Sequence, residues 1–248
     1  MFENVKILGQ DLMGECAEVN ANGRPGFVLF SPLFNITSPH NWLWYAPTFA
    51  DRLPNRLHAW MFRQFLANGM VIAGIDVGES YGNPESRDTF TVFHAKLTKD
   101  YNLSKKACLM PQSRGGLMLY NWAVEHPEKV ACIAGIYPVC DMKSYPGIDV
   151  AAPAYSLEVA ELEAHINEHN PVNRLVSLAK AIVPIFHVHG DSDTLVPLEC
   201  NSSDLAGRYQ YLDGSMELLI VPGKGHDESD EYFKCQRLVD FVLKHKGM

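Results

Sequence analysis

The chain has 248 residues, of which 47% are hydrophobic and 20% are charged, and its formal net charge at pH 7 is −8. This length predicts one large α/β domain over residues 1–248, and the hydrophobic content is sufficient for a sizeable core. The acidic balance and the lack of a basic cluster argue against nucleic acid as a partner, and no apolar run is long enough to span a membrane.

The first residues lack the basic and then apolar pattern of a secretory signal, so we expect a cytoplasmic protein; a signal peptide removed earlier would leave no trace. The six cysteines form no C-x-x-C pair and show no metal-ligand spacing. We expect all six to be reduced. Cys108 and Cys132 lie in apolar strand-like runs and are expected to be buried.

Strand-like and helix-like segments alternate along the chain, which predicts a mostly parallel, twisted sheet with helices on both faces. The expected strands are an opening antiparallel pair, 15–20 and 26–31, followed by 41–46, 70–77, 107–110, 130–138, 181–190 and 216–221. Within them, Trp42 and Trp44 share one strand face and are expected to pack in the core. Helices are expected to begin at Asn55, Ser86 and Ser113, and a last helix is expected over 230–245.

Residues 141–178 break the alternation, because they contain two helix-like pieces and no strand. The first piece, 157–169, is acidic, and the second begins at Asn170-Pro171, a capping residue followed by proline in the first turn. Open α/β sheets bind ligands at the carboxyl ends of their strands. We therefore expect this segment to form a short helical lid over such a site.

The run Leu-Met-Pro-Gln-Ser-Arg-Gly-Gly places Ser113 between a strand and a helix. This pattern is typical of a nucleophile elbow, a strained turn that exposes a serine hydroxyl, and Gly115 and Gly116 would let the following helix approach closely. The alternative is a plain turn in which the serine caps a helix. Pro111 stands where such elbows usually have glycine, so we expect a slightly reshaped turn.

Two later segments supply the groups that would activate this serine. His226 follows a strand in a glycine-flanked loop and is the expected base. Asp193 is the expected acid, with Asp191 and then Asp141 as alternatives. The resulting order, Ser113, Asp193, His226, is that of the α/β-hydrolases.

The alternating pair His187 and His189 could bind a metal, but without a third ligand nearby a structural role is favoured. No metal and no cofactor are expected.

An oxyanion hole needs two backbone N–H donors. One is expected from Arg114, the residue after the serine, and the other from Thr48 or Phe49, since Pro47 has no N–H. The side chain of Arg114 would either bind a substrate carboxylate or the oxyanion, or form a surface or structural ion pair. Glu79 and Tyr81 follow another strand and would either line the substrate pocket or shape their loop.

From Asn41 onward the chain resembles the α/β-hydrolase superfamily. It is similar to a group of small bacterial hydrolases, related to the prolyl-oligopeptidase and esterase branch, that read Ser-Arg-Gly-Gly-Leu as residues 113–117 do and continue much like 120–123 and 141–147. This resemblance implies the fold and the triad but not the substrate. Ser-Arg-x-Gly is also similar to the elbow of glucuronoyl esterases, to which the rest of the chain adds nothing.

We therefore expect a serine hydrolase that acts on small-molecule carboxylic esters through an acyl-enzyme. A peptidase of the prolyl-oligopeptidase branch is the enzymatic alternative. A non-catalytic protein that binds small molecules on the same fold is the alternative from another class. The oligomeric state is not indicated by the sequence.

Overall fold

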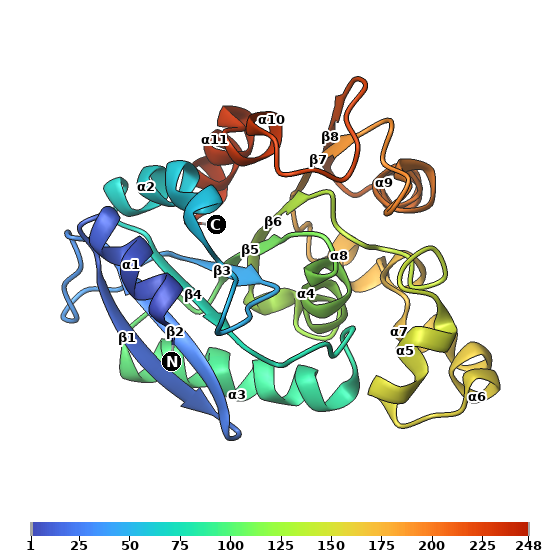
Figure 1. Ribbon diagram of the computed structural model, residues 1–248, viewed down its shortest axis with the longest axis horizontal. Coiled ribbons are helices and arrows are strands. Elements are labelled where there is room, and N and C mark those ends of the chain that lie inside the picture. Colours follow the sequence, from blue (N-terminus) through green and yellow to red (C-terminus); the bar gives the residue numbers. More distant parts are fainter. Residues whose placement is uncertain (1, 248) are drawn as a thin grey trace.

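The computed structural model describes residues 2–247 and contains an eight-stranded sheet in the order β1-β2-β4-β3-β5-β6-β7-β8 (Figure 1). β1 and β2 pair antiparallel, as do β2 and β4, and all other neighbours are parallel. The predicted, mostly parallel sheet is thus confirmed. Its strands are β1 Glu15–Ala21, β2 Arg24–Phe30, β3 Trp42–Ala46, β4 Val71–Ile75, β5 Ala107–Pro111, β6 Val130–Ile136, β7 Ile185–Gly190 and β8 Met216–Val221.

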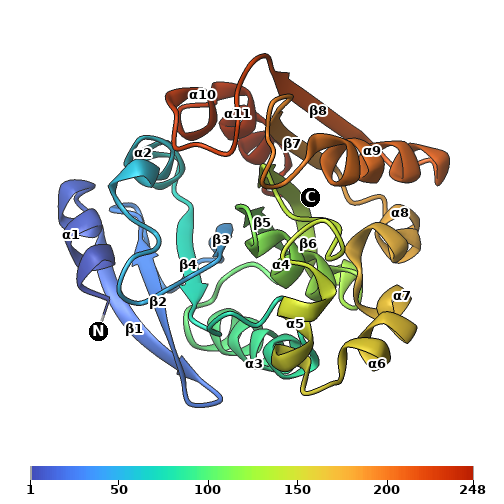
Figure 2. The same cartoon turned by 45° about the vertical axis from the view of Figure 1, so that its right-hand side comes forward.

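Helices cover both faces of this sheet (Figures 1 and 2). One face packs against α1 Glu3–Asp11, α2 Ala59–Ala67, α10 Asp230–Phe233 and α11 Gln236–His245. The other face packs against α3 Pro84–Asp100, α4 Gly115–Ala123, α8 Val176–Lys180 and α9 Ser202–Tyr211. Short 3-10 turns lie at Arg56–His58, Pro127–Lys129, Pro171–Asn173 and Leu198–Cys200.

The central strands are apolar along their whole length because both faces of the sheet are covered. Every residue of β3, β5 and β6 is buried. Trp42 and Trp44 stack with their ring centroids 5.4 Å apart in the core of the α3–α4 face, which confirms their predicted packing role. Cys108 and Cys132 are buried on neighbouring strands, and all six cysteines are free.

Three helical features differ from the sequence-based expectation. The helix expected to begin at Ser86 begins at Pro84, because the Asn83 side chain caps it by accepting a hydrogen bond from the Ser86 amide at 2.8 Å. The expected last helix is split in two, α10 and α11. Helices α1 and α9 and the helix over Ile148–Tyr155 were not expected.

The segment 141–178 contains α5 Ile148–Tyr155, α6 Val159–Ala164 and α7 Ile166–His169, which lie together beside α4 and α3 in Figure 2. These helices share an apolar cluster with Leu117 of α4 and Val139. Two hydrogen bonds tie α5 to the loop after β4: the Tyr155 hydroxyl donates to the Tyr81 carbonyl at 2.9 Å, and the Asn83 side chain donates to the Ala154 carbonyl at 2.5 Å. Within residues 2–247, no helix has the length and apolar character needed to span a membrane.

Candidate active site

Ser113 lies on the sharp turn between β5 and α4, with a left-handed backbone at φ +49°. A non-glycine residue in this region is strained, as expected of a nucleophile elbow. The turn is compact because α4 begins against its neighbours: a Cβ on Gly115 would overlap the Ala46 carbonyl, and one on Gly116 would overlap that of Val139. Pro111 fits as the last residue of β5, opposite Ala46.

The structure brings the three predicted residues of the triad together at the carboxyl edge of the sheet. The Oγ of Ser113 lies 2.9 Å from Nε2 of His226, and Nδ1 of His226 lies 2.7 Å from Oδ2 of Asp193. With a neutral imidazole, Nδ1–H donates to the carboxylate and Nε2 accepts the serine hydroxyl proton. The loops after β5, β7 and β8 thus supply an alcohol, an acid and a base in one hydrogen-bonded line.

Asp193 is held by more than His226. Its Oδ1 accepts from the amides of Leu195 at 3.0 Å and Val196 at 2.8 Å. Burial by itself raises the pKa of Asp193. Hydrogen bonds from His189, His226 and the Val196 amide lower the pKa by more than burial raises it, so the pKa lies well below its ordinary value. The carboxylate is therefore charged near neutral pH.

The two alternative acids have other partners. Oδ1 of Asp191 accepts from the Gly223 amide at 2.7 Å, which fixes the turn after β8. Oδ1 of Asp141 accepts from the Asn170 side chain at 2.7 Å, at the start of the helical segment.

Among residues 2–247, neither the Arg114 amide at the elbow nor the Thr48 amide in the loop after β3 has an acceptor. Thr48 follows the Ala46-Pro47 peptide, which lies against Gly115 in the first turn of α4. The expectation that Phe49 could serve instead is wrong, since its amide already donates to the Leu53 carbonyl at 2.9 Å. The amides of Arg114 and Thr48 are therefore both free to donate.

Comparison with known protein families matches residues 76–248 to the prolyl oligopeptidase family. The chain belongs to this family. It is thereby a member of the α/β-hydrolase superfamily of serine hydrolases, and the matched stretch contains Ser113, Asp193 and His226. A comparison with curated proteins finds no match.

Solved structures with a similar fold include dipeptidyl peptidase 4 from Porphyromonas gingivalis (TM-score 0.73, 13% identity), oligopeptidase B from Leishmania major (0.67, 14%) and an S-formylglutathione hydrolase from Agrobacterium tumefaciens (0.71, 16%). Each similarity covers 94% of this chain. The chain spans about a third of the length of the two peptidases, 35% and 36%, and 94% of the third protein. These likenesses show the fold.

The Arg114 side chain of this prolyl oligopeptidase family member pairs with an acid of the protein. Its Nη1 lies 2.5 Å from Oε1 of Glu79, which is also 3.3 Å from Nη2 of Arg52. Both guanidinium groups lie over the Phe49 ring, Arg52 at 4.4 Å from the centroid and Arg114 at 5.8 Å. Of the roles predicted for the Arg114 side chain, the structure shows the ion pair.

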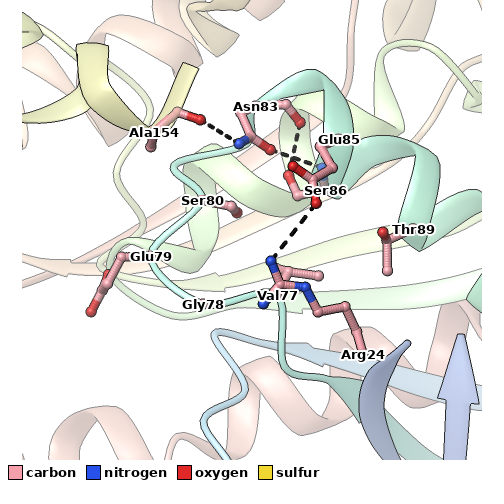
Figure 3. Close-up of a pocket in the computed structure, with 10 residues that line it drawn as sticks. All are labelled: Arg24, Val77, Gly78, Glu79, Ser80, Asn83, Glu85, Ser86, Thr89 and Ala154. Carbon is pink, nitrogen blue, oxygen red and sulfur yellow. Dashed lines mark hydrogen bonds and ion pairs between the residues drawn. The ribbon is translucent and has the colours of Figure 1, made fainter. Parts of the chain in front are cut away.

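A polar cavity of about 260 Å³ lies between the end of β4 and the start of α3 (Figure 3). Glu79 borders it on one side and Thr89 on the other. Ser113 is not part of its lining. Tyr81, with a left-handed backbone at φ +47°, packs against the helical segment instead, so Glu79 and Tyr81 both shape the loop next to the elbow.

Two residues of the site were not expected. Tyr137, just after β6, lies against His226, with the centroids of the two rings 4.3 Å apart. Gln112, next to the serine, donates to the Tyr137 hydroxyl at 3.3 Å and accepts from Tyr45 at 2.9 Å and His58 at 2.8 Å. A sequence signal existed for both, because each lies at the carboxyl end of a predicted strand.

Proposed function

We propose that this chain hydrolyses carboxylic esters of small molecules through an acyl-enzyme on Ser113. The observation that carries the proposal is the unbroken hydrogen-bonded line from Asp193 through His226 to the serine hydroxyl. A serine becomes nucleophilic when an adjacent base takes its proton. Each member of the line has the partner that this chemistry needs.

In the first half of the reaction, Oγ of Ser113 attacks the acyl carbon and its proton moves to Nε2 of His226. The charge of Asp193 stabilises the imidazolium. The amides of Arg114 and Thr48 donate to the oxyanion. The imidazolium then protonates the departing alkoxide, and water attacks the acyl-enzyme with His226 as the base.

Two observations favour an ester over a peptide. A hydrolase of matching extent, named for S-formylglutathione, shares the fold over 94% of both chains. A peptidase that recognises a free amino terminus needs a carboxylate for it, and Glu79, the acid beside Arg114, is already paired with two arginines. The family match favours peptide hydrolysis as the second candidate.

The helical segment 141–178 is proposed to act as a lid over the substrate. Its helix α5 is hydrogen-bonded to the loop that carries Glu79 and Tyr81. The elbow sequence from Ser113 to Leu117 supports a place in the group of small bacterial hydrolases that it resembles.

The test combines a covalent probe with matched substrates. A fluorophosphonate should label the parent and not Ser113→Ala, and kcat/KM should be compared for an ester and an anilide of the same acyl group. We expect loss of labelling and a loss of hydrolysis on the order of a million-fold in the variant. Equal labelling of the two proteins would refute the role of Ser113, and a higher kcat/KM for the anilide would favour the peptidase.

A further inference from the structure

A chain of buried polar side chains leads from Asp193 into the core. His187 and His189 lie on one face of β7, and both Nδ1 atoms contact the Oγ of Ser202 on α9, at 2.9 and 2.8 Å. The Tyr120 hydroxyl on α4 lies 2.7 Å from Nε2 of His187. Tyr120, His187, Ser202 and His189, here called the buried relay, have no exposed surface.

Which group donates in each hydrogen bond of the buried relay can be assigned from Tyr120, its end farthest from Asp193. Within residues 2–247 the Tyr120 hydroxyl has one partner, Nε2 of His187, so it donates to that nitrogen. Burial lowers the pKa of His187 to about 3, so its imidazole is neutral. Because its Nε2 accepts from Tyr120, its single ring proton is on Nδ1. That proton is donated to Ser202, whose own hydroxyl proton must go to Nδ1 of His189.

The near end of the buried relay agrees with this assignment. Nε2 of His189 lies 2.9 Å from the Val196 carbonyl and 3.3 Å from Oδ2 of Asp193. Both neighbours are acceptors, so this nitrogen must carry a proton. With its single ring proton on Nε2, His189 accepts at Nδ1, which matches the hydroxyl proton that Ser202 directs to it.

We propose that His189 is a positioning residue for Asp193, an inference that rests on the proposed function. Its Nε2–H is shared between the carboxylate and the Val196 carbonyl, so it holds the acid and the turn after it together. Ser202 fixes the tautomer, because a flipped imidazole would set a lone pair against the carboxylate. Since Oδ2 also accepts from His226, this support orients the base toward the serine.

The buried relay also ties the acid to the nucleophile. Tyr120 lies on α4, the helix that begins at the elbow, while His189 lies on the strand that leads to Asp193. The two ends of the catalytic line are thereby joined through the core as well as through His226. Reacting groups misplaced by about 1 Å can cost about a hundredfold in rate.

The test compares His189→Gln with His189→Leu. A glutamine amide can still donate from the position of Nε2, whereas leucine cannot. We expect kcat for an activated ester to fall about a hundredfold in His189→Leu with KM unchanged, and to stay within about tenfold of the parent in His189→Gln. The downfield proton NMR resonance of Nδ1–H of His226 should persist in the glutamine variant and shift or vanish in the leucine variant.

Ser202→Ala and Tyr120→Phe keep the proposal testable if His189→Leu does not fold. The first removes the proton that sets the tautomer and should lower kcat more than the second, which acts from the far end. Thermal unfolding of each variant measures the structural contribution separately. Parent-like kcat and an unshifted resonance in Ser202→Ala would overturn the proposal. An active Ser113→Ala would instead overturn the proposed function.

Discussion

At the scale of single residues, two aspartates two positions apart have different partners. Asp193 has a fully buried side chain and faces His226, and its lowered pKa keeps it charged. Asp191 is exposed and bonds the Gly223 amide in the neighbouring turn. The sequence alone does not tell which of the two is the acid that pairs with His226. Their hydrogen-bond partners in the structure distinguish them.

Asp193→Asn should therefore damage catalysis far more than Asp191→Asn. An amide at position 193 would favour the wrong tautomer of His226, and such a change lowers kcat by roughly ten-thousand-fold in another serine hydrolase. Asp191→Asn, the matched control, loses one charge at a turn and should stay within about tenfold of the parent, as a weakened hydrogen bond implies. Steady-state kinetics with an activated ester measures both, and similar losses in the two variants would contradict the assignment.

Arg114 contributes two separate groups to the site. Its amide has no acceptor among the described residues, and its guanidinium pairs with Glu79 through Nη1. The side chain is 29% exposed and lies next to the nucleophile, so its other N–H groups can meet a substrate. Because the amide survives Arg114→Ala, the two contributions can be measured apart.

Arg114→Ala should reduce kcat/KM more for esters with a nearby carboxylate than for neutral ones. A charge-assisted hydrogen bond contributes roughly 1.5–3 kcal/mol, which is about ten- to a hundredfold in kcat/KM. Arg52→Ala is the matched control, since Arg52 also pairs with Glu79 but does not follow the serine. Equal losses for acidic and neutral esters would mean that the guanidinium acts on the elbow, and no loss would exclude a substrate contact.

At the scale of the elements, the elbow depends on how closely α4 approaches β3 and the loop after β6. Gly115 has an ordinary backbone in the first turn of α4, so alanine would suit the helix itself. The obstacle is the Ala46 carbonyl, which a Cβ would overlap. The same contact sets where the loop after β3, which carries Thr48, passes the first turn of α4.

Gly115→Ala should therefore destabilise the protein and lower kcat together. Overpacking of this kind costs roughly 1–3 kcal/mol, and the displaced loop would move an oxyanion donor. Gly207→Ala in α9 is the matched control, because nothing lies within 4 Å of its Cβ position, and it should stabilise by about 0.5–1 kcal/mol. Chemical unfolding and kcat of both variants check this, and a parent-like Gly115→Ala would show that the approach is not needed.

The elements that the sequence predicts are those with strong local patterns. β8 lies at Met216–Val221 as expected, and the expected cap at Asn55 begins the turn that leads into α2. The cap of α3 was misplaced because Asn83 and Ser86 are both good capping residues. Helix α9 was missed because Leu205 and Tyr209 are the only large apolar residues that it buries.

At the scale of the whole molecule, the site is assembled from loops far apart in sequence. Ser113, Asp193 and His226 could be predicted because each follows a recognisable strand within a motif. The buried relay could not, because nothing in the sequence shows that Tyr120 of α4 and Ser202 of α9 meet the same face of β7. Patterns near a strand end predict residues of the site, while contacts between layers of the fold remain hidden in the sequence.

Several buried histidines make the stability of the whole molecule depend on pH. Burial lowers the pKa of His58 to about 4, of His94 to about 4 and of His187 to about 3. In the unfolded chain these groups titrate near pH 6.5. The unfolded state therefore binds more protons than the folded state between about pH 6.5 and 4, and the stability present above pH 6.5 is lost as the pH falls through this window.

The free energy of unfolding should thus fall steeply on acidification, with a slope that approaches about 4 kcal/mol per pH unit near pH 5 for three protons. His94→Gln should remove about one third of this slope, because the variant takes up one proton fewer on unfolding. His165→Gln is the matched control: the pKa of exposed His165 is raised by Glu168, so its loss should not flatten the curve. Urea unfolding between pH 7 and 5 measures the slopes. A flat parent curve, or equal slopes for the parent and His94→Gln, would show that these histidines do not stay neutral in the folded protein.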